Sequence, residues 1–301
     1  MEPTKLMLVY DFTTQPFSIG DILCFQEMGL CICKEKGYTE IEFVFTYSPR
    51  NPVIRVPAFQ HIKPDNFLKY VPWLIPVADV NPLVSSVKIL THEQYGGLSK
   101  DGYQVWPPKL GVEYQFYAIM EHVLKHYEKY KSIPYLSCKP DVVKWAHEFC
   151  GDYVSIQLRR NPHNGKRNSR YTAWRDFIKS ATHQKFIIVC DKSEVDDRMR
   201  MPNVIFAQDH AISALEGMAL IQASRFHMGA SSGPCVMRMF SDKPYVLYNS
   251  QRAQDGAAGI RYNGSKAHYP YSTKHQWNRI DFESTELLIK DYEEMTQCAL
   301  A

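Results

Sequence analysis

Strand and helix patterns alternate along residues 152–250, and this alternation limits what the chain can fold into. The apolar runs in this stretch are short, as in buried strands, and the segments between them show helical spacing. Parallel strands need such helical crossovers, which are right-handed. The pattern therefore predicts a doubly wound α/β sheet of the nucleotide-binding type. The predicted strands are 153–158, 185–190, 203–207, 225–228 and 245–248.

Helices are expected between these strands and at both ends of the C-terminal half. Thr172 is a plausible N-cap for one of them, and Gly151 is a plausible end for another. The small residues before Pro234 are expected to open a further helix, since proline is tolerated in a first turn. The predicted helices are 141–149, 172–182, 213–224, 234–240 and 284–301.

The N-terminal half begins with the same kind of unit. Residues 5–11 and 40–47 are predicted strands, and residues 22–36 form a predicted helix that Gly37 ends. A strand, a helix and a second strand in this order are the unit of a parallel sheet.

Residues 51–108 are rich in proline, which argues against long helices in this segment. Two short runs, 73–77 and 84–90, are strand candidates. Helical spacing then predicts a helix at 111–131, and a short strand is expected at 133–136.

Two Rossmann-like, doubly wound domains facing a cleft are therefore expected. Residues 1–140 form the predicted N-terminal domain with a proline-rich insertion, and residues 141–301 form the predicted C-terminal domain.

Composition and charge exclude several classes of protein. The net charge of +3 is far below that of a dedicated nucleic-acid binder. No apolar run is long enough to span a bilayer, and the N-terminus lacks the design of a signal peptide. The eight cysteines contain no CxxC pair, which favours reduced, buried thiols over a zinc site. We therefore expect a cytoplasmic protein.

Two arginines, Arg159 and Arg160, follow the first predicted strand of the C-terminal half. Guanidinium groups match the geometry of phosphate and stay charged at any ordinary pH. Because side chains alternate along a strand, only one of the two is expected to point into a binding site. The alternative is that they form surface ion pairs.

A second predicted anion-binding element is the small-residue loop from Gly229 to Gly233. Small residues let an anion approach the backbone, and a helix that begins here would offer free N–H groups. Ser231 and Ser232 add hydroxyl donors. The alternative is that Ser232 only caps the helix.

Several familiar catalytic motifs are absent. The sequence contains no GxGxxG, no P-loop, no GxSxG and no DxD triplet, and its histidines lack metal-site spacing. Anion binding should therefore rest on arginine, hydroxyl groups and backbone amides, with no metal and no cofactor.

At these residues the chain resembles a GT-B glycosyltransferase of the fucosyltransferase-like group. The resemblance covers about residues 152–250, in matching order and spacing. Gln157 departs from the family, which has a histidine at that position of an H-x-R-R motif. The matching stretches are Gln157-Leu-Arg-Arg160, Val189-Cys-Asp191, Glu216 with Leu220-Ile-Gln-Ala223, and Ala230-Ser-Ser232.

The resemblance implies roles for individual residues. It implies that Arg159 binds the β-phosphate of the donor and stabilises the leaving diphosphate, and that Glu216 contacts the nucleoside. Fixed donors aimed at the developing charge would lower the barrier. Because Gln157 replaces the histidine, the donor is either of the GDP or of the UDP type. The full expected donor set is Gln157, Arg160, Asp191, Glu216, Gly229, Ser231, Ser232 and Gly233.

An inverting enzyme also needs a base near the acceptor hydroxyl. Asp21, in the Ile19-Gly20-Asp21 turn, is the first candidate, and Asp11 is the second. The alternative is that Gly20 allows the turn and Asp21 caps the following helix.

The sequence thus predicts a metal-independent glycosyltransferase. Its N-terminal domain, 1–140, would bind the acceptor, and its C-terminal domain, 141–301, would bind the nucleotide-sugar. The enzyme would move a sugar from a nucleoside-diphosphate sugar to a glycan or polysaccharide acceptor, or to another hydroxyl. Two alternatives stay open: a nucleotide-sugar epimerase on the same scaffold, and a non-catalytic protein that binds nucleotides or sugars.

Overall fold

The computed structural model describes residues 4–50, 67–111, 116–160, 165–210, 212–250 and 259–299. It divides the chain into two compact units, Met1–Ser137 and Cys138–Ala301, which are described separately below. Expectations for residues 51–66, 161–164 and 251–258 lie outside the described residues. No helix in the described ranges is both long and apolar enough to cross a membrane.

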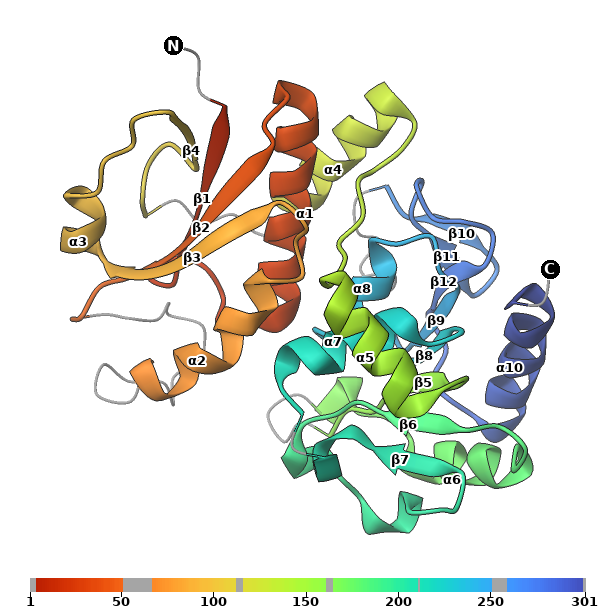
Figure 1. Ribbon diagram of the computed structural model, residues 1–301. Coiled ribbons are helices and arrows are strands. Elements are labelled where there is room, and N and C mark those ends of the chain that lie inside the picture. Colours follow the sequence, from red (N-terminus) through yellow and green to blue (C-terminus); the bar gives the residue numbers. More distant parts are fainter. Residues whose placement is uncertain are drawn as a thin grey trace. The chain divides into compact units, whose positions relative to one another are not determined.

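Unit 1 is built on a four-stranded parallel sheet in the order β3-β2-β1-β4 (Figure 1). The central strands are buried along almost their whole length, as in parallel sheets whose two faces are both covered. The predicted strands at 5–11, 40–47 and 84–90 are confirmed. The strands are β1 (Lys5–Asp11), β2 (Glu40–Tyr47), β3 (Val84–Thr91) and β4 (Tyr103–Trp106).

Helix α1 connects β1 to β2 and packs against the sheet. Gly29 makes this close packing possible, since a Cβ atom there would lie 2.7 Å from Cδ2 of Leu8. Gly37 ends the helix in the left-handed conformation, as predicted. The other helices of the unit are shorter. The helices are α1 (Ile19–Lys36), α2 (Phe67–Ala78), α3 (His92–Gly96) and α4 (Phe116–Tyr130).

Two predictions for unit 1 are wrong. Residues 73–77 belong to helix α2, which contains both Pro72 and Pro76. The helix forms because Phe67, Val71 and Leu74 recur at helical spacing and are buried, which outweighs the missing amide hydrogens. Residues 133–136 form no strand and belong to the segment that leads into the second unit.

Unit 2 contains an eight-stranded sheet in the order β10-β11-β12-β9-β8-β5-β6-β7. Its pairs from β12 to β7 are parallel, whereas β10, β11 and β12 pair antiparallel at one edge (Figure 1). The strands are β5 (Val154–Gln157), β6 (Phe186–Ile188), β7 (Val204–Phe206), β8 (His227–Ala230), β9 (Tyr245–Tyr248), β10 (Arg261–Asn263), β11 (Lys266–His268) and β12 (Gln276–Arg279).

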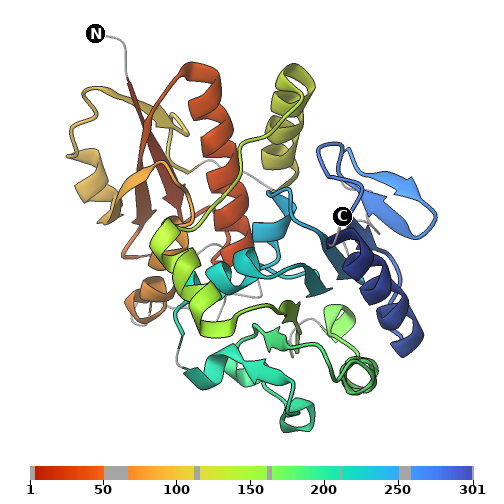
Figure 2. The ribbon, with the colours of Figure 1, turned by 45° about the vertical axis from the view of Figure 1, so that its right-hand side comes forward.

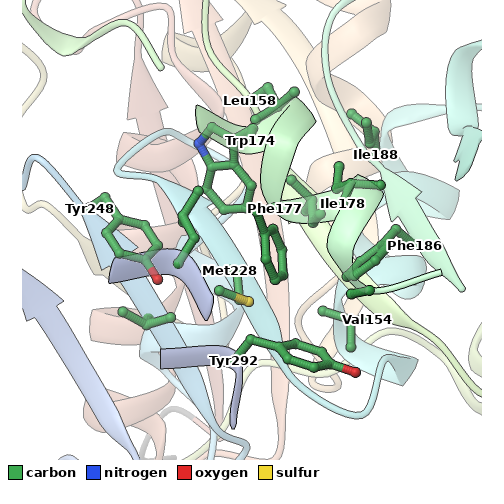
Figure 3. Close-up of a cluster of buried hydrophobic side chains, with 14 of the residues drawn as sticks. Val154, Leu158, Trp174, Phe177, Ile178, Phe186, Ile188, Met228, Tyr248 and Tyr292 are labelled. Atoms are coloured by element: carbon green, nitrogen blue, oxygen red, sulfur yellow. The ribbon is translucent and has the colours of Figure 1, made fainter. Parts of the chain in front are cut away.

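Four helices with bounds close to the predicted ones accompany this sheet. Helices α6 and α10 lie side by side over one face (Figures 1 and 2). Beneath them is the core in Figure 3, where the rings of Trp174, Phe177 and Tyr292 surround Met228. The helices are α5 (Pro140–Cys150), α6 (Tyr171–Ser180), α7 (Ala214–Ala223) and α10 (Thr285–Ala299).

Three local predictions for unit 2 are wrong. Thr172 is not a cap, because α6 already begins at Tyr171. Strand β8 begins at His227 and continues through Gly229, so Gly229 belongs to the sheet and not to a loop. The expected helix at 234–240 is only α8 (Val236–Met239), with Cys235 as its N-cap in place of Ser232. A helix this short lends no appreciable dipole to the loop.

Each sheet has a point where the direction of strand addition reverses. In unit 2, β6 and β7 are added on one side of β5, and β8 lies on the other. In unit 1, β2 and β3 lie on one side of β1, and β4 lies on the other. Ligands of open α/β sheets bind outside the carboxyl ends of the strands at such switch points. The candidate sites are therefore the ends of β5 and β8, and of β1 and β4.

Candidate functional site

The carboxyl end of β5 carries polar atoms that have no protein partner. Gln157 is the last residue of the strand and is 3% exposed. Within the described part of the chain, Oε1 of Gln157 and Nε of Arg159 are buried without a hydrogen bond. Burial therefore lowers the pKa of the Arg159 guanidinium, although it stays a cation. Arg159 is half-buried, and the Glu194 carboxylate acts on its guanidinium electrostatically. Its Nε hydrogen has no partner among the described residues, which favours an anionic ligand.

The backbone of Arg159 is held in place by Ser169. The Arg159 N–H donates to Oγ of Ser169 at 3.1 Å, and the Ser169 N–H donates to the Arg159 carbonyl oxygen at 2.9 Å. These two bonds fix the direction in which the chain leaves β5. They also hold Ser169 next to the end of the strand.

The loop after β8 lies next to Arg159. Cys235 acts electrostatically on the Arg159 guanidinium, and its thiol donates to the Ser232 carbonyl oxygen at 2.7 Å. Ser231 is buried, and the Ser232 hydroxyl is a buried group without a partner among the described residues. The structure thus brings together the predicted residues Gln157, Arg159 and Ser232.

Arg167 is a cation that sequence reasoning did not assign to the site. It ends the 3₁₀ turn Gly165–Arg167, and its guanidinium donates to the Ser231 carbonyl oxygen. The Asn249 amide, just after β9, donates to the Lys166 carbonyl oxygen at 2.6 Å. Lys166 and Arg167 are therefore hydrogen-bonded to the segments that follow β9 and β8. The basic composition of the loop after β5 was the only signal in the sequence.

Gly229 has a packing reason to be glycine. It pairs with Gln157 across β5 and β8. A Cβ atom at residue 229 would lie 2.4 Å from the Gln157 carbonyl oxygen and 2.8 Å from its amide nitrogen. Both atoms belong to the backbone and cannot move away alone. The residue therefore lets the two strand ends approach at the switch point.

Two of the predicted donor residues have local partners instead. Arg160 is exposed, its N–H donates to Oε1 of Glu194 at 2.9 Å, and its guanidinium lies 3.8 Å from Asp196. This matches the surface ion pair considered as an alternative. Asp191 caps the 3₁₀ turn Lys192–Glu194 and accepts from the Ser193 N–H at 2.8 Å and from its hydroxyl at 2.6 Å.

Glu216 also has a local partner, at the start of α7. Its carboxylate accepts the Ser213 N–H at 2.5 Å, and its own N–H donates to the Ser213 hydroxyl at 3.2 Å. This capping box satisfies two amides of the first turn. Gly233 lies in the turn that leads to α8, where its carbonyl oxygen accepts the Val236 N–H.

The two candidate bases of unit 1 differ in their surroundings. Asp21 lies in the first turn of α1 and is half-buried, and the cap of that helix is Ser18, so the capping alternative for Asp21 is wrong. Burial and the nearby Asp21 together raise the pKa of Tyr10. Asp11 is only 3% exposed and is surrounded by hydrogen-bond donors.

No metal centre is found in the described ranges, where no three histidine, cysteine or acidic side chains cluster suitably. All eight cysteines lie within these ranges. None forms a disulfide, and all except Cys298 are buried.

Comparison with known proteins identifies the fold. No family model matches the chain, and no curated protein matches its sequence. The ADP-heptose lipopolysaccharide heptosyltransferase II of E. coli superposes with a TM-score of 0.62 at 7% identity, over 98% of this chain and 100% of that one. The chain has the GT-B fold.

Two further structures agree with this fold. A family 9 glycosyltransferase from Veillonella parvula has a TM-score of 0.57 at 9% identity, covering 98% of both chains. The E. coli heptosyltransferase WaaC with ADP has a TM-score of 0.51 at 10% identity, covering 98% of this chain and 99% of that one. Each unit of this GT-B chain is thus one Rossmann-like half of the fold.

Proposed function

We propose that this protein is a glycosyltransferase that uses a nucleoside-diphosphate sugar. The observation that carries the proposal is a pair of buried polar atoms without a partner among the described residues, Nε of Arg159 after β5 and the Ser232 hydroxyl after β8. Both lie at the β5/β8 switch point of a GT-B fold, where the fold places its ligands. The proposal assigns donor binding to unit 2 and acceptor binding to unit 1.

The proposed chemistry follows from charge. Breaking the bond between the anomeric carbon and the diphosphate leaves an electron pair on a phosphate oxygen. Arg159 and Arg167, with the Ser232 hydroxyl, would neutralise that charge from fixed positions. Donors that are already oriented stabilise a developing anion without reorganising during the reaction.

The other residues expected to bind the donor sugar nucleotide are assigned less specific roles. Glu216 engages Ser213 through one carboxylate oxygen, so its other oxygen can contact the nucleoside. Ser231 belongs to the loop after β8, which is proposed to hold the phosphates. Arg160 and Asp191, whose partners are local, stay predictions from the motif.

The donor and acceptor classes are also part of the proposal. The structures compared above are heptosyltransferases and a family 9 enzyme, so the narrower resemblance to the fucosyltransferase-like group stays a prediction. One of them was solved with ADP, which adds ADP-sugars to the UDP and GDP types. The proposed acceptor is a glycan or polysaccharide hydroxyl.

A thermal-shift screen with UDP, GDP, ADP and their sugars tests donor binding. At one hundred times its dissociation constant, a true ligand stabilises the folded protein by about 2.7 kcal/mol. We expect one nucleotide base to give a clear increase in melting temperature, with inorganic phosphate as the control for non-specific anion binding. No shift with any of these nucleotides would contradict the proposal.

Product analysis then separates transfer from its alternatives. A glycosylated acceptor supports the proposal, interconversion of the free nucleotide-sugar indicates an epimerase, and binding without turnover indicates a binding protein.

Activity is expected to persist in EDTA. The proposed charge partners of the diphosphate are guanidinium groups and a hydroxyl, which need no bridging cation. We expect the rate of transfer in excess EDTA to stay within about twofold of the untreated rate. Loss of activity in EDTA that Mg²⁺ or Mn²⁺ restores would contradict metal independence.

A further inference from the structure

Helix α8 carries an arginine that is fully buried inside unit 2. Nη2 of Arg238 donates to the carbonyl oxygen of Ser224 and to its Oγ, the latter at 2.6 Å. Nε and Nη1 of the same guanidinium are buried without a partner among the described residues. Burial lowers the pKa of Arg238 to about 10, so the group is still a cation at neutral pH.

This buried cation is unfavourable for the stability of the fold. A charge inside a protein is ordinarily paired with a charge of opposite sign, because the interior solvates it poorly. In the described ranges no carboxylate is hydrogen-bonded to Arg238, and the exposed Asp242 acts on it only electrostatically. Stability alone therefore does not explain an arginine at this position.

The hydrogen bonds of Arg238 connect α8 to both strands of the switch point. Its partner Ser224 lies just before β8, and the Ser224 hydroxyl is 2.7 Å from the Ser155 hydroxyl in β5. The Ser155 hydroxyl is in turn 2.9 Å from Nδ1 of His227, the first residue of β8. Both serines and the histidine are buried. The guanidinium thus fixes α8 relative to β5 and to the start of β8.

Helix α8 also holds the loop that carries Ser232. The Cys235 thiol donates to the Ser232 carbonyl oxygen at 2.7 Å. The N–H groups of the next two residues donate to the carbonyl oxygens of Gly233 and Pro234, both at 3.2 Å. Three successive carbonyls of the loop are therefore bonded to the first turn of α8. A shift of α8 would displace the Ser232 hydroxyl, which is proposed to bind phosphate.

We propose that Arg238 is a positioning residue for the donor site, because it fixes α8 and, through α8, the Ser232 hydroxyl. The inference rests on the proposed binding of a nucleoside diphosphate by unit 2 and extends it to a residue that touches no ligand. A buried cation is kept here at a cost in stability because it holds the loop after β8 in place. Departures of this kind from the most stable sequence are common near functional sites.

The substitution Arg238→Met separates this role from ordinary packing. Methionine keeps an unbranched, apolar stem but has no charge and no donor, so the bonds to Ser224 are lost together with the buried cation. We expect the dissociation constant of the nucleoside diphosphate to rise about 10- to 100-fold, the range seen when a residue that orients a metal ligand is lost. The melting temperature without ligand should equal or exceed that of the parent, since replacing buried charges by apolar groups is often neutral or stabilising.

Isothermal titration calorimetry with UDP, GDP and ADP measures binding, and thermal unfolding of the same preparations measures stability. Arg225→Met is the matched control, because Arg225 follows Ser224 in the sequence but lies 3.5 Å from Asp152. The control variant should bind the nucleotide as the parent does. Arg238→Lys keeps a positive charge and a donor, and should recover part of the lost affinity.

A double-mutant cycle tests whether the effect passes through the loop after β8. If Arg238 acts through Ser232, Arg238→Met should weaken binding less in a Ser232→Ala protein than in the parent. Equal losses of affinity in the two backgrounds would contradict the proposed connection.

The outcomes are distinguishable. An Arg238→Met protein that binds the nucleotide as tightly as the parent overturns the positioning role and leaves the proposed function intact. A variant that melts below the parent, or does not fold, shows that Arg238 serves the core, and also overturns the role. A parent protein that binds none of UDP, GDP and ADP overturns the proposed function and this inference together.

Discussion

Replacing Arg159 with alanine is expected to abolish sugar transfer and weaken nucleoside-diphosphate binding. A charge-assisted hydrogen bond contributes about 1.5–3 kcal/mol, so the dissociation constant should rise about 10- to 100-fold. The loss in kcat should be larger, about 100- to 1,000-fold, because charge on the phosphate grows in the transition state. Isothermal titration calorimetry with the nucleoside diphosphate and the transfer assay measure the two effects.

The same variant should show an unusual stability profile. In the ligand-free protein the Arg159 guanidinium is partly buried, and its Nε has no partner among the described residues. Removing such a group relieves a desolvation cost, so the melting temperature without ligand should not fall.

Arg225→Ala is the matched control for Arg159→Ala. Arg225 lies two residues before β8, at the amino ends of the strands and so away from the candidate site, where its guanidinium is 3.5 Å from Asp152. Nucleotide binding by the Arg225 variant should equal that of the parent. If the Arg159 variant binds UDP, GDP and ADP as tightly as the parent does, the donor site is not at the end of β5.

The substitution Gly229→Ala should damage both folding and binding. The added Cβ atom would meet backbone atoms of Gln157 at 2.4 and 2.8 Å, so β5 and β8 would have to separate. Overpacking of this kind costs about 1–3 kcal/mol, and more where the backbone must shift. Urea unfolding should show a lower midpoint, and the protein that remains folded should bind the nucleotide more weakly.

Gly165→Ala is the control for the unfolding experiment. A Cβ atom at residue 165 would have its nearest contact at 3.9 Å, and the residue does not need a left-handed conformation. Its unfolding midpoint should equal or slightly exceed that of the parent. If both alanine variants unfold at the parent's midpoint, the close approach of β5 and β8 is not what residue 229 provides.

The sequence was most informative where a strand is buried on both faces. Strands β1 and β2 have their predicted bounds because most of their residues are apolar and most are buried. Helix α2 was missed because proline has a low helix propensity. The helix forms nevertheless, since Phe67, Val71 and Leu74 are buried on one of its faces. Strand β8 was placed two residues early, since Gly229 is a poor strand former that only its contact with Gln157 explains.

The site was predictable only in part, for a related reason. Arg159 and Ser232 were found because each follows a recognisable strand. Arg167 reaches the Ser231 carbonyl from 64 residues away, and Asn249 reaches the Lys166 carbonyl from 83 residues away. No local pattern records such pairings, because they arise from the order of strands in a sheet.

The hydrogen bonds that hold residues 165–169, after β5, bear on the kinetics of ligand binding. Ser169 is bonded to the Arg159 backbone, and Asn249 is bonded to the 3₁₀ turn Gly165–Arg167, before any ligand is present. The entropy of ordering residues 165–169 is then lost during folding and not again during binding. These residues of unit 2 should accordingly form a preorganised binding site. The rate of nucleotide association should depend on diffusion and on the charge of the incoming phosphates, with no slow conformational phase.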